Sequence, residues 1–111
     1  FNGGGITECC YNALRLINAL LKTKRRRARS LSLLMEDAVA AARRGQKTPD
    51  GYYNVERMLR RVLTGRGQVL LCGTCMDARG LAADDVLDGA RRSTMDELSA
   101  TTLSADKVLV F

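Results

Sequence analysis

Apolar residues recur at the spacing of an α-helix in two segments of the chain. In the first segment they form one helical face: Cys10, Leu14, Ile17 and Leu21. In the second they follow Asn54, a residue type favoured as a helix cap: Val55, Met58, Leu59, Val62 and Leu63. We therefore predict amphipathic helices over residues 8–22 and from residue 55 to the glycines at 65 and 67.

Short, mainly apolar runs predict buried strands, because a strand that is covered on both faces has no polar side. Two such runs are Leu31–Met35 and Val69–Leu71. We also expect a closing strand over Asp106–Phe111, and Phe1–Asn2 is typical of the end of a further strand.

Caps and glycines predict three shorter helices. They are Ala38–Arg44 after Asp37, Val86–Arg91 after Asp84 or Asp85, and about Met95–Leu103 after a capping box at Thr94-Met-Asp-Glu97. Strands and helices thus alternate, which predicts parallel strands joined by right-handed crossovers, with helices on both faces of the sheet. No repeat, low-complexity tract or linker divides the sequence. We predict a single domain over residues 1–111, an α/β three-layer α/β/α sandwich with a mostly parallel sheet.

The composition is that of an ordinary globule. The 111 residues suffice for one domain with a core, and 46% of them are hydrophobic. No apolar run reaches the roughly 18–20 residues that a membrane helix needs, and we find no signal peptide. Four cysteines in an alternating sequence of this kind do not indicate a secreted disulfide framework. We expect a cytoplasmic protein with reduced thiols and no membrane partner.

Positive charge is concentrated in one run. The formal net charge is +6, and six positive charges lie within Lys22–Arg29. A solvated basic loop after a helix C-terminus is the usual interpretation of such a run. The alternative is a surface for RNA, DNA or an acidic protein. No aromatic residue lies within the run, which argues against base stacking there.

The candidate chemistry lies in the segment Gln68-Val-Leu-Leu-Cys72-Gly-Thr-Cys75-Met-Asp-Ala-Arg-Gly80. Its apolar run predicts a buried strand, and Met76–Arg79 predicts a helix that Gly80 ends. A cysteine at the carboxyl end of a parallel strand lies where α/β sheets place their sites. The amides of a following helix, together with Arg79, favour thiolate over thiol. We therefore predict a reactive thiol at Cys72 with Cys75 as its partner.

This cysteine run, continued by Leu81, and the closing Ala105-Asp106-Lys107-Val108-Leu109 segment resemble the DsrE/DsrF-like family of small sulfur-handling proteins. Gly51-Tyr-Tyr-Asn54 adds to the resemblance, which covers most of the chain from Phe1 to Phe111. It implies a flavodoxin-like three-layer fold and homo-oligomers, commonly trimers or hexamers. For some members it also implies the relay of sulfur as a cysteine persulfide, and hence sulfurtransferase activity.

The resemblance also assigns roles. In the sulfur-relay members the active cysteine precedes an Arg-Gly pair by a fixed step, and counting back from Arg79-Gly80 leads to Cys72. Cys75 falls where those members usually have a small residue, and its expected role is that of a resolving thiol. The candidate catalytic residues are thus Cys72, Cys75 and Arg79, acting between sulfur donor and acceptor proteins. The family opens with a full strand, so we expect that strand upstream of Phe1–Asn2 or supplied from elsewhere, for example by another subunit.

Two other functions fit the same residues. In a zinc site, Cys72 and Cys75 would supply two ligands and Cys9 and Cys10 the other two, although adjacent cysteines rarely both bind one metal. In a non-catalytic binding or scaffold module, the loop Gln46–Tyr53 would form the interface, and the cysteines would be small buried residues. The chain has no histidine, which excludes histidine chemistry. We predict no cofactor, because the glycines at 3–5 match neither a dinucleotide nor a P-loop motif.

Overall fold

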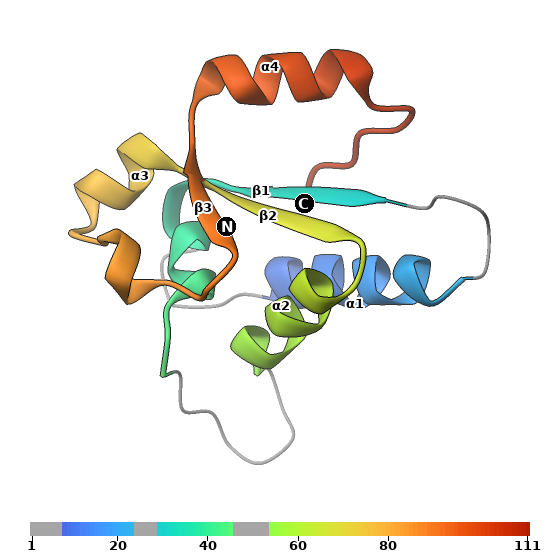
Figure 1. Ribbon diagram of the computed structural model, residues 1–111, viewed down its shortest axis with the longest axis horizontal. Coiled ribbons are helices and arrows are strands. Elements are labelled where there is room, and N and C mark those ends of the chain that lie inside the picture. The colour runs from blue at the N-terminus through green and yellow to red at the C-terminus, as the bar shows by residue number, and fades with distance from the viewer. Residues whose placement is uncertain (1–7, 24–28, 46–53) are drawn as a thin grey trace.

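The computed structural model describes residues 8–23, 29–45 and 54–111 of the chain. Helices and strands alternate along it (Figure 1). In order, the elements are α1 (Glu8–Lys22), β1 (Ser30–Leu34), η1 (Glu36–Ala42, a 3₁₀ helix), α2 (Val55–Thr64), β2 (Gly67–Cys72), α3 (Gly73–Ala78), η2 (Ala83–Asp85, also 3₁₀), β3 (Ala90–Ser93) and α4 (Met95–Ser104). Within these ranges no helix is long and apolar enough to cross a bilayer.

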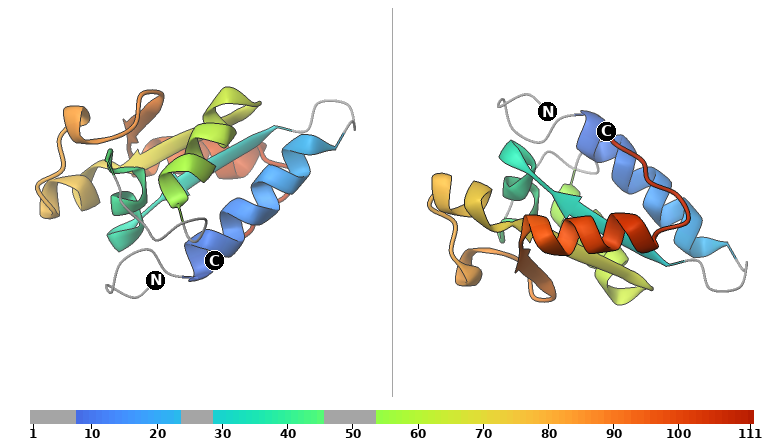
Figure 2. Two further views of the ribbon diagram at one scale, coloured as in Figure 1. Left: turned by 90° about the horizontal axis from the view of Figure 1, so that it is seen from below. Right: turned by 90° about the horizontal axis from the view of Figure 1, so that it is seen from above.

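The three strands form a parallel sheet in the order β1-β2-β3. Helices α1 and α2 lie on one side of this sheet and α4 lies on the other (Figures 1 and 2). Because side chains alternate along a strand, Val69 and Leu71 face α1 and α2, whereas the fully buried Leu70 faces the opposite side. This arrangement confirms the predicted α/β three-layer sandwich.

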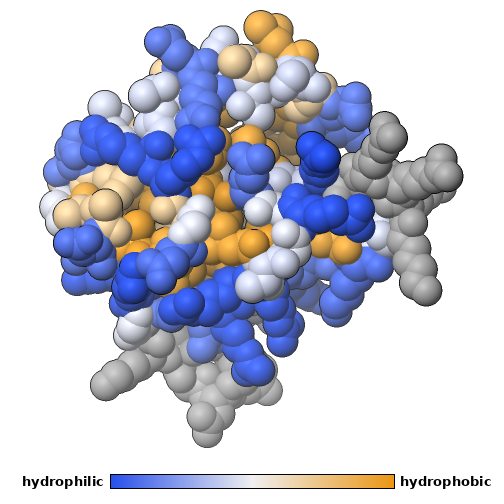
Figure 3. All heavy atoms as spheres, viewed as in Figure 1, coloured by the Kyte–Doolittle hydropathy of each residue, from blue (hydrophilic) through white to orange (hydrophobic). Residues whose placement is uncertain are grey.

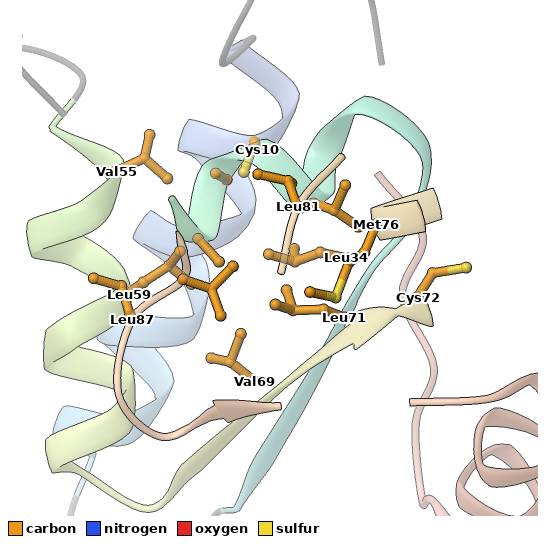
Figure 4. Packing of buried hydrophobic residues seen from close by; sticks show 14 of the residues in the cluster. Cys10, Leu34, Val55, Leu59, Val69, Leu71, Cys72, Met76, Leu81 and Leu87 are labelled. Atoms are coloured by element: carbon orange, nitrogen blue, oxygen red, sulfur yellow. The ribbon is translucent and has the colours of Figure 1, made fainter. Parts of the chain in front are cut away.

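The core lies between the sheet and the apolar faces of α1 and α2 (Figure 4). Leu14 of α1 and Leu59 and Val62 of α2 are almost completely buried. Ile17 and Leu21 pack against the same cluster at its margin. The helical spacing read from the sequence therefore identified the buried faces correctly. The Asn54 cap is also confirmed, since its side-chain oxygen accepts a hydrogen bond from the Arg57 amide at 3.0 Å.

The segment after β1 differs from its prediction. An α-helix over Ala38–Arg44 with Asp37 as its cap was expected, but the chain forms the 3₁₀ helix η1, which begins at Glu36 and has no side-chain cap. The carboxylate of Asp37 is bound by Arg79 and is therefore not available to the helix amides. Glu36 has a φ of 51°, and it is the one non-glycine residue with positive φ in the described ranges.

The segment 83–93 also differs from its prediction. A helix over Val86–Arg91 was expected, but the chain makes only the short η2 and then β3. Val86 and Leu87 are buried, and Leu87 donates a backbone hydrogen bond to Ala42 at 2.9 Å. A turn at Gly89, with a φ of 94°, then leads into the strand. Pairing with β2 overrides the local helix signal, and the polar sequence of β3 suits the edge of a sheet.

The predicted closing strand over Asp106–Phe111 is wrong for this structure. The capping residue Thr94 and α4 are as predicted, but the residues that follow α4 pair with no strand in the described part of the chain. They are exposed, including the apolar Val110 at 92%. The predicted strand end at Phe1–Asn2 and the loop Gln46–Tyr53 lie outside the described residues.

Candidate thiol site

Cys72 and Cys75 flank the junction between β2 and α3. Cys72 is the last residue of β2 and the cap of α3, and Cys75 lies within the first turn of that helix. Cys72 pairs in register with Ser93 of β3, and its side chain is 9% exposed. Figure 4 shows its sulfur at the margin of the core, directed away from the labelled apolar side chains. Cys75 is half-buried.

The surroundings of Cys72 favour its thiolate. Its Sγ lies 3.3 Å from the hydroxyl Oγ1 of Thr74. Hydrogen bonds from the Thr74 hydroxyl and then from the Cys75 thiol lower the pKa of Cys72, and burial opposes this effect only in part. The backbone amides of residues 74 and 75 add a smaller contribution, although neither makes a capping hydrogen bond of ordinary length to Sγ.

The surroundings of Cys75 have the opposite effect. Its thiol donates to the Cys72 sulfur, and this hydrogen bond, together with burial, raises the pKa of Cys75. The backbone N–H of Glu36 partly offsets the rise, and so does the positive charge of Arg79. Glu36 is the residue with the left-handed backbone. Such conformations are costly for residues other than glycine, and they concentrate at functional sites.

Arg79 lies beside Cys75 rather than beside Cys72. Its guanidinium binds Oδ1 of Asp37, with N–O distances of 2.7 and 2.8 Å. It also donates to the backbone carbonyl of Cys75 at 3.2 Å. Arg79 thus connects η1 to α3 and holds the turn that contains Cys75.

A second arginine lies at the start of α3. The Arg92 guanidinium packs directly on Gly73, where an added Cβ would lie 2.7 Å from Nε. It also forms a two-pronged ion pair with Asp77, at 2.7 and 2.8 Å. The bond to Asp77 and, less strongly, the Cys72 thiolate raise the pKa of Arg92. A larger residue at position 73 would displace the Arg92 guanidinium, which is the end of a flexible and partly exposed side chain.

Cys10 does not join the site. Cys10 is buried within the core (Figure 4), as its helical phase predicted. The side chain of Cys9 lies outside the described residues. Among the described side chains, no group of three or more His, Cys, Asp and Glu residues is arranged to hold a metal ion. Cys72 and Cys75 alone are two ligands, fewer than a structural zinc site requires.

Three residues of the site were not predicted from the sequence: Thr74, Glu36 and Arg92. Thr74 stands between the cysteines, but no role was predicted for it. Glu36 contributes through its backbone, and nothing in its side chain signals that. Arg92 directly follows Val86–Arg91, the segment that was expected to be helical, and it reaches Gly73 only because β3 pairs with β2. Of the three, only Thr74 carried a signal in the sequence, since a hydroxyl two residues after a cysteine is within reach of its sulfur.

The fold and the site together define a class of protein. It is a small α/β protein whose candidate reactive group is a thiol at the carboxyl end of a parallel strand, with a second thiol beside it. A profile of the DsrE/DsrF-like family matches residues 2–111. The chain belongs to the DsrE/DsrF-like family, and this membership supports a role related to sulfur relay.

Individual relatives agree with this assignment. Escherichia coli protein YchN is 44% identical over 108 residues, which span 95% of this chain and 88% of YchN. An uncharacterized protein of Methanocaldococcus jannaschii is 32% identical over 105 residues, or 94% of this chain and 88% of that protein. The crystal structure of YchN from E. coli matches with a TM-score of 0.88 at 41% identity, covering 97% of this chain and 92% of that one.

Proposed function

We propose that this protein relays sulfur as a persulfide on Cys72. The observation that carries the proposal is the difference between the two thiols, because their surroundings lower the pKa of Cys72 and raise that of Cys75. Neighbouring titratable groups with oppositely shifted pKa values usually have different roles. Cys72 is the nucleophile, and Cys75 is the protonated thiol beside it. Membership of the DsrE/DsrF-like family supports the same chemistry.

The relay consists of two exchange steps. The Cys72 thiolate attacks the outer sulfur of a donor persulfide, the donor's S–S bond breaks, and the donor leaves as a thiolate. Cys72 then carries the outer sulfur in a new S–S bond. An acceptor thiolate attacks that outer sulfur, and Cys72 leaves as a thiolate. Electrons balance without an external oxidant, because each step exchanges one S–S bond for another.

Cys75 provides a second way to unload the sulfur. Its thiolate attacks Sγ of Cys72, forms a disulfide between the two residues and expels the outer sulfur as hydrosulfide. A cellular dithiol must then reduce this disulfide before the next cycle. Because the pKa of Cys75 is raised, this route is slow at neutral pH and the persulfide persists for transfer. The scheme requires reduced thiols, as in the cytoplasm.

The test is intact mass spectrometry after incubation with a small persulfide donor. We expect the wild type to gain about 32 Da, the mass of one sulfur. Cys72→Ser is expected to lose this adduct, whereas Cys75→Ser keeps it and holds it longer, because the resolving thiol is absent. Alkylation of Cys72 is expected to proceed well below the ordinary thiol pKa of about 8.5.

Two results would contradict the relay. An adduct that is still found in Cys72→Ser would show that another cysteine carries the persulfide. The absence of any adduct, together with slow alkylation of Cys72 and Cys75 at neutral pH, would leave the fold as a scaffold or binding module. Zinc in the native mass spectrum, lost in Cys72→Ser, would support the metal site instead.

We also propose that the chain forms a homo-oligomer. Large apolar side chains are exposed along the end of α4 and the segment 108–111: Leu103, Val108, Leu109, Val110 and Phe111. Contiguous exposed apolar residues usually mark an interface. A second copy of this chain is the partner that the family resemblance favours, as a trimer or a hexamer.

A further inference from the structure

A groove with a volume of about 400 Å³ lies between α1 and α2. It is on the side of the molecule away from α4, where the two helices run side by side (Figure 2). Of the nine described residues that line it, four are cationic: Arg15 and Lys22 of α1, and Arg57 and Arg61 of α2. No Asp or Glu is among the described residues that line it. In Figure 3, strongly hydrophilic side chains gather over this lower part of the surface.

The four cations of this groove have no acidic partner among the described residues. The five ion pairs of the described structure all use arginines outside it: Arg44, Arg60, Arg79, Arg91 and Arg92. None of the four groove cations takes part in an ion pair with a described residue. Arg57 and Arg61 are also four residues apart on α2, a spacing at which like charges destabilise a helix. A polyanion in the groove would remove this repulsion.

The neutral polar groups of the groove are already used within the protein. The Asn18 amide donates to the backbone oxygens of Leu14 and Met58, at 2.9 and 3.4 Å. Asn54 caps α2 through its side-chain oxygen. The other polar or aromatic side chains that line the groove are the four cations and Tyr11.

Tyr11 provides an aromatic surface among these charges. The Arg15 guanidinium carbon lies 5.9 Å from the centre of the Tyr11 ring, within the range of a cation–π contact. Aromatic rings and arginine planes together are the surfaces on which unpaired bases stack. The basic run Lys22–Arg29 contains no such ring, whereas α1 places Tyr11 one turn before Arg15, and the packing of α2 brings Arg57 and Arg61 to the same groove.

We propose that this groove binds single-stranded nucleic acid, with phosphates on the four cations and a base against Tyr11. An acidic peptide would neutralise the cations, but its carboxylates would not stack on the aromatic ring. The cations are also spread along the groove. Arg15 and Lys22 are about 10 Å apart along α1, by the helix rise of 1.5 Å per residue. This spacing fits an extended chain of phosphates rather than a single anion, and the site is independent of the thiol chemistry.

The test is fluorescence anisotropy with labelled oligouridylate and oligothymidylate of about a dozen nucleotides, at ~50 mM salt. We expect Arg57→Gln with Arg61→Gln to weaken binding roughly tenfold or more. The slope of log affinity against log salt should also fall by about 1.4, the value for two phosphate contacts on a single strand. Tyr11→Ala is expected to weaken binding by about fivefold or more, whereas Tyr11→Phe keeps it.

The control variant combines Arg60→Gln with Arg66→Gln. It also removes two positive charges, one of them from the same helix, but neither residue lines the groove. We expect its affinity to stay within about threefold of the wild type, as for charges that touch no phosphate. Urea midpoints and the alkylation rate of Cys72 report whether each variant is folded.

Several results bear on the proposal. If the two double variants lose the same amount of affinity, the proposal is overturned, because binding then depends on the net charge of the protein and not on the groove. Competition by polyglutamate as effective as that by RNA would overturn it in favour of an acidic protein. No binding of either oligonucleotide at ~50 mM salt would overturn it outright. Tighter binding of RNA than DNA would support a contact to the 2′-hydroxyl as well, and equal binding would support contacts to phosphate and base alone.

Discussion

The hydroxyl of Thr74 determines which of two neighbouring thiols ionises first. It lies 3.3 Å from Sγ of Cys72 and is the largest cause of the lowered pKa of that thiol. Cys75, three residues after Cys72, donates a hydrogen bond to the same sulfur, and this bond raises the pKa of Cys75. Two identical side chains thus have pKa values shifted in opposite directions, because of hydrogen bonds to one sulfur atom.

We expect Thr74→Val to raise the pKa of Cys72, because the variant keeps the shape of the side chain but removes the hydroxyl. A thiol reacts as its thiolate, so at pH 7 the alkylation of Cys72 should slow severalfold, and the midpoint of its pH profile should move to higher pH. Thr74→Ser, which keeps the hydroxyl, is the control and should behave like the wild type. An unchanged midpoint in Thr74→Val would exclude the hydroxyl as the cause.

At the scale of elements, α4 is tied to the edge of the sheet mainly by one carboxylate. Glu97 of α4 accepts hydrogen bonds from Arg91 at 2.9 and 2.6 Å and from Ser93 at 2.5 Å. Both partners belong to β3. Few other contacts hold the helix, since none of its residues is buried. Arg91 and then Ser93 lower the pKa of Glu97 to about 2.

This carboxylate makes the attachment of α4 depend on pH. A group whose pKa is lowered by folding stabilises the folded state above its unfolded pKa, here about 4.3. The contribution is lost as the pH falls toward the folded pKa of about 2. We expect the urea midpoint of the wild type to fall across this window. In Glu97→Gln it should be lower at neutral pH and should fall less steeply.

Asp96→Asn is the matched control for that experiment. Asp96 is the neighbouring acid in the first turn of α4 and forms no ion pair with a described residue. Its variant should follow the pH profile of the wild type. If Glu97→Gln and the wild type have parallel pH profiles, the contacts to Arg91 and Ser93 do not stabilise the protein in solution.

At the scale of the whole molecule, apolar surface is distributed unevenly. Helices α1, α2 and η1 cover one face of the sheet, and the residues on this face are nearly all buried from solvent. At the end of α4 and in the segment after it, by contrast, apolar residues face solvent, Leu103 at 86% and Val110 at 92%. Burial of such residues is the main driving force for association of subunits.

We expect Leu109→Asp with Val110→Asp to reduce the molar mass measured by size-exclusion chromatography with light scattering. Charged residues at a buried interface oppose its formation, because their desolvation is not compensated. Ser99→Asp with Ala100→Asp adds the same charge at two exposed positions of α4 and should leave the mass unchanged. A wild type that is monomeric at all concentrations would refute self-association through this segment.

The sequence by itself determined the elements whose signals are local. The faces of α1 and α2 follow from the spacing of their apolar residues, and the starts of α2 and α4 follow from Asn54 and Thr94. The strand β2 and its cysteine pair were likewise predicted, because an apolar run ending at a turn needs no partner to be recognised. These features depend on residues a few positions apart.

Only the tertiary structure decided the features that depend on residues far apart in the chain. The polar strand β3 exists because it pairs with β2, and the left-handed backbone of Glu36 has no signal in the residues around it. The cations of α2 reach Tyr11 and the cations of α1 only because the two helices pack against each other. Periodicity shows which face of an element is buried. It does not show what lies opposite that face, because that depends on packing between distant segments.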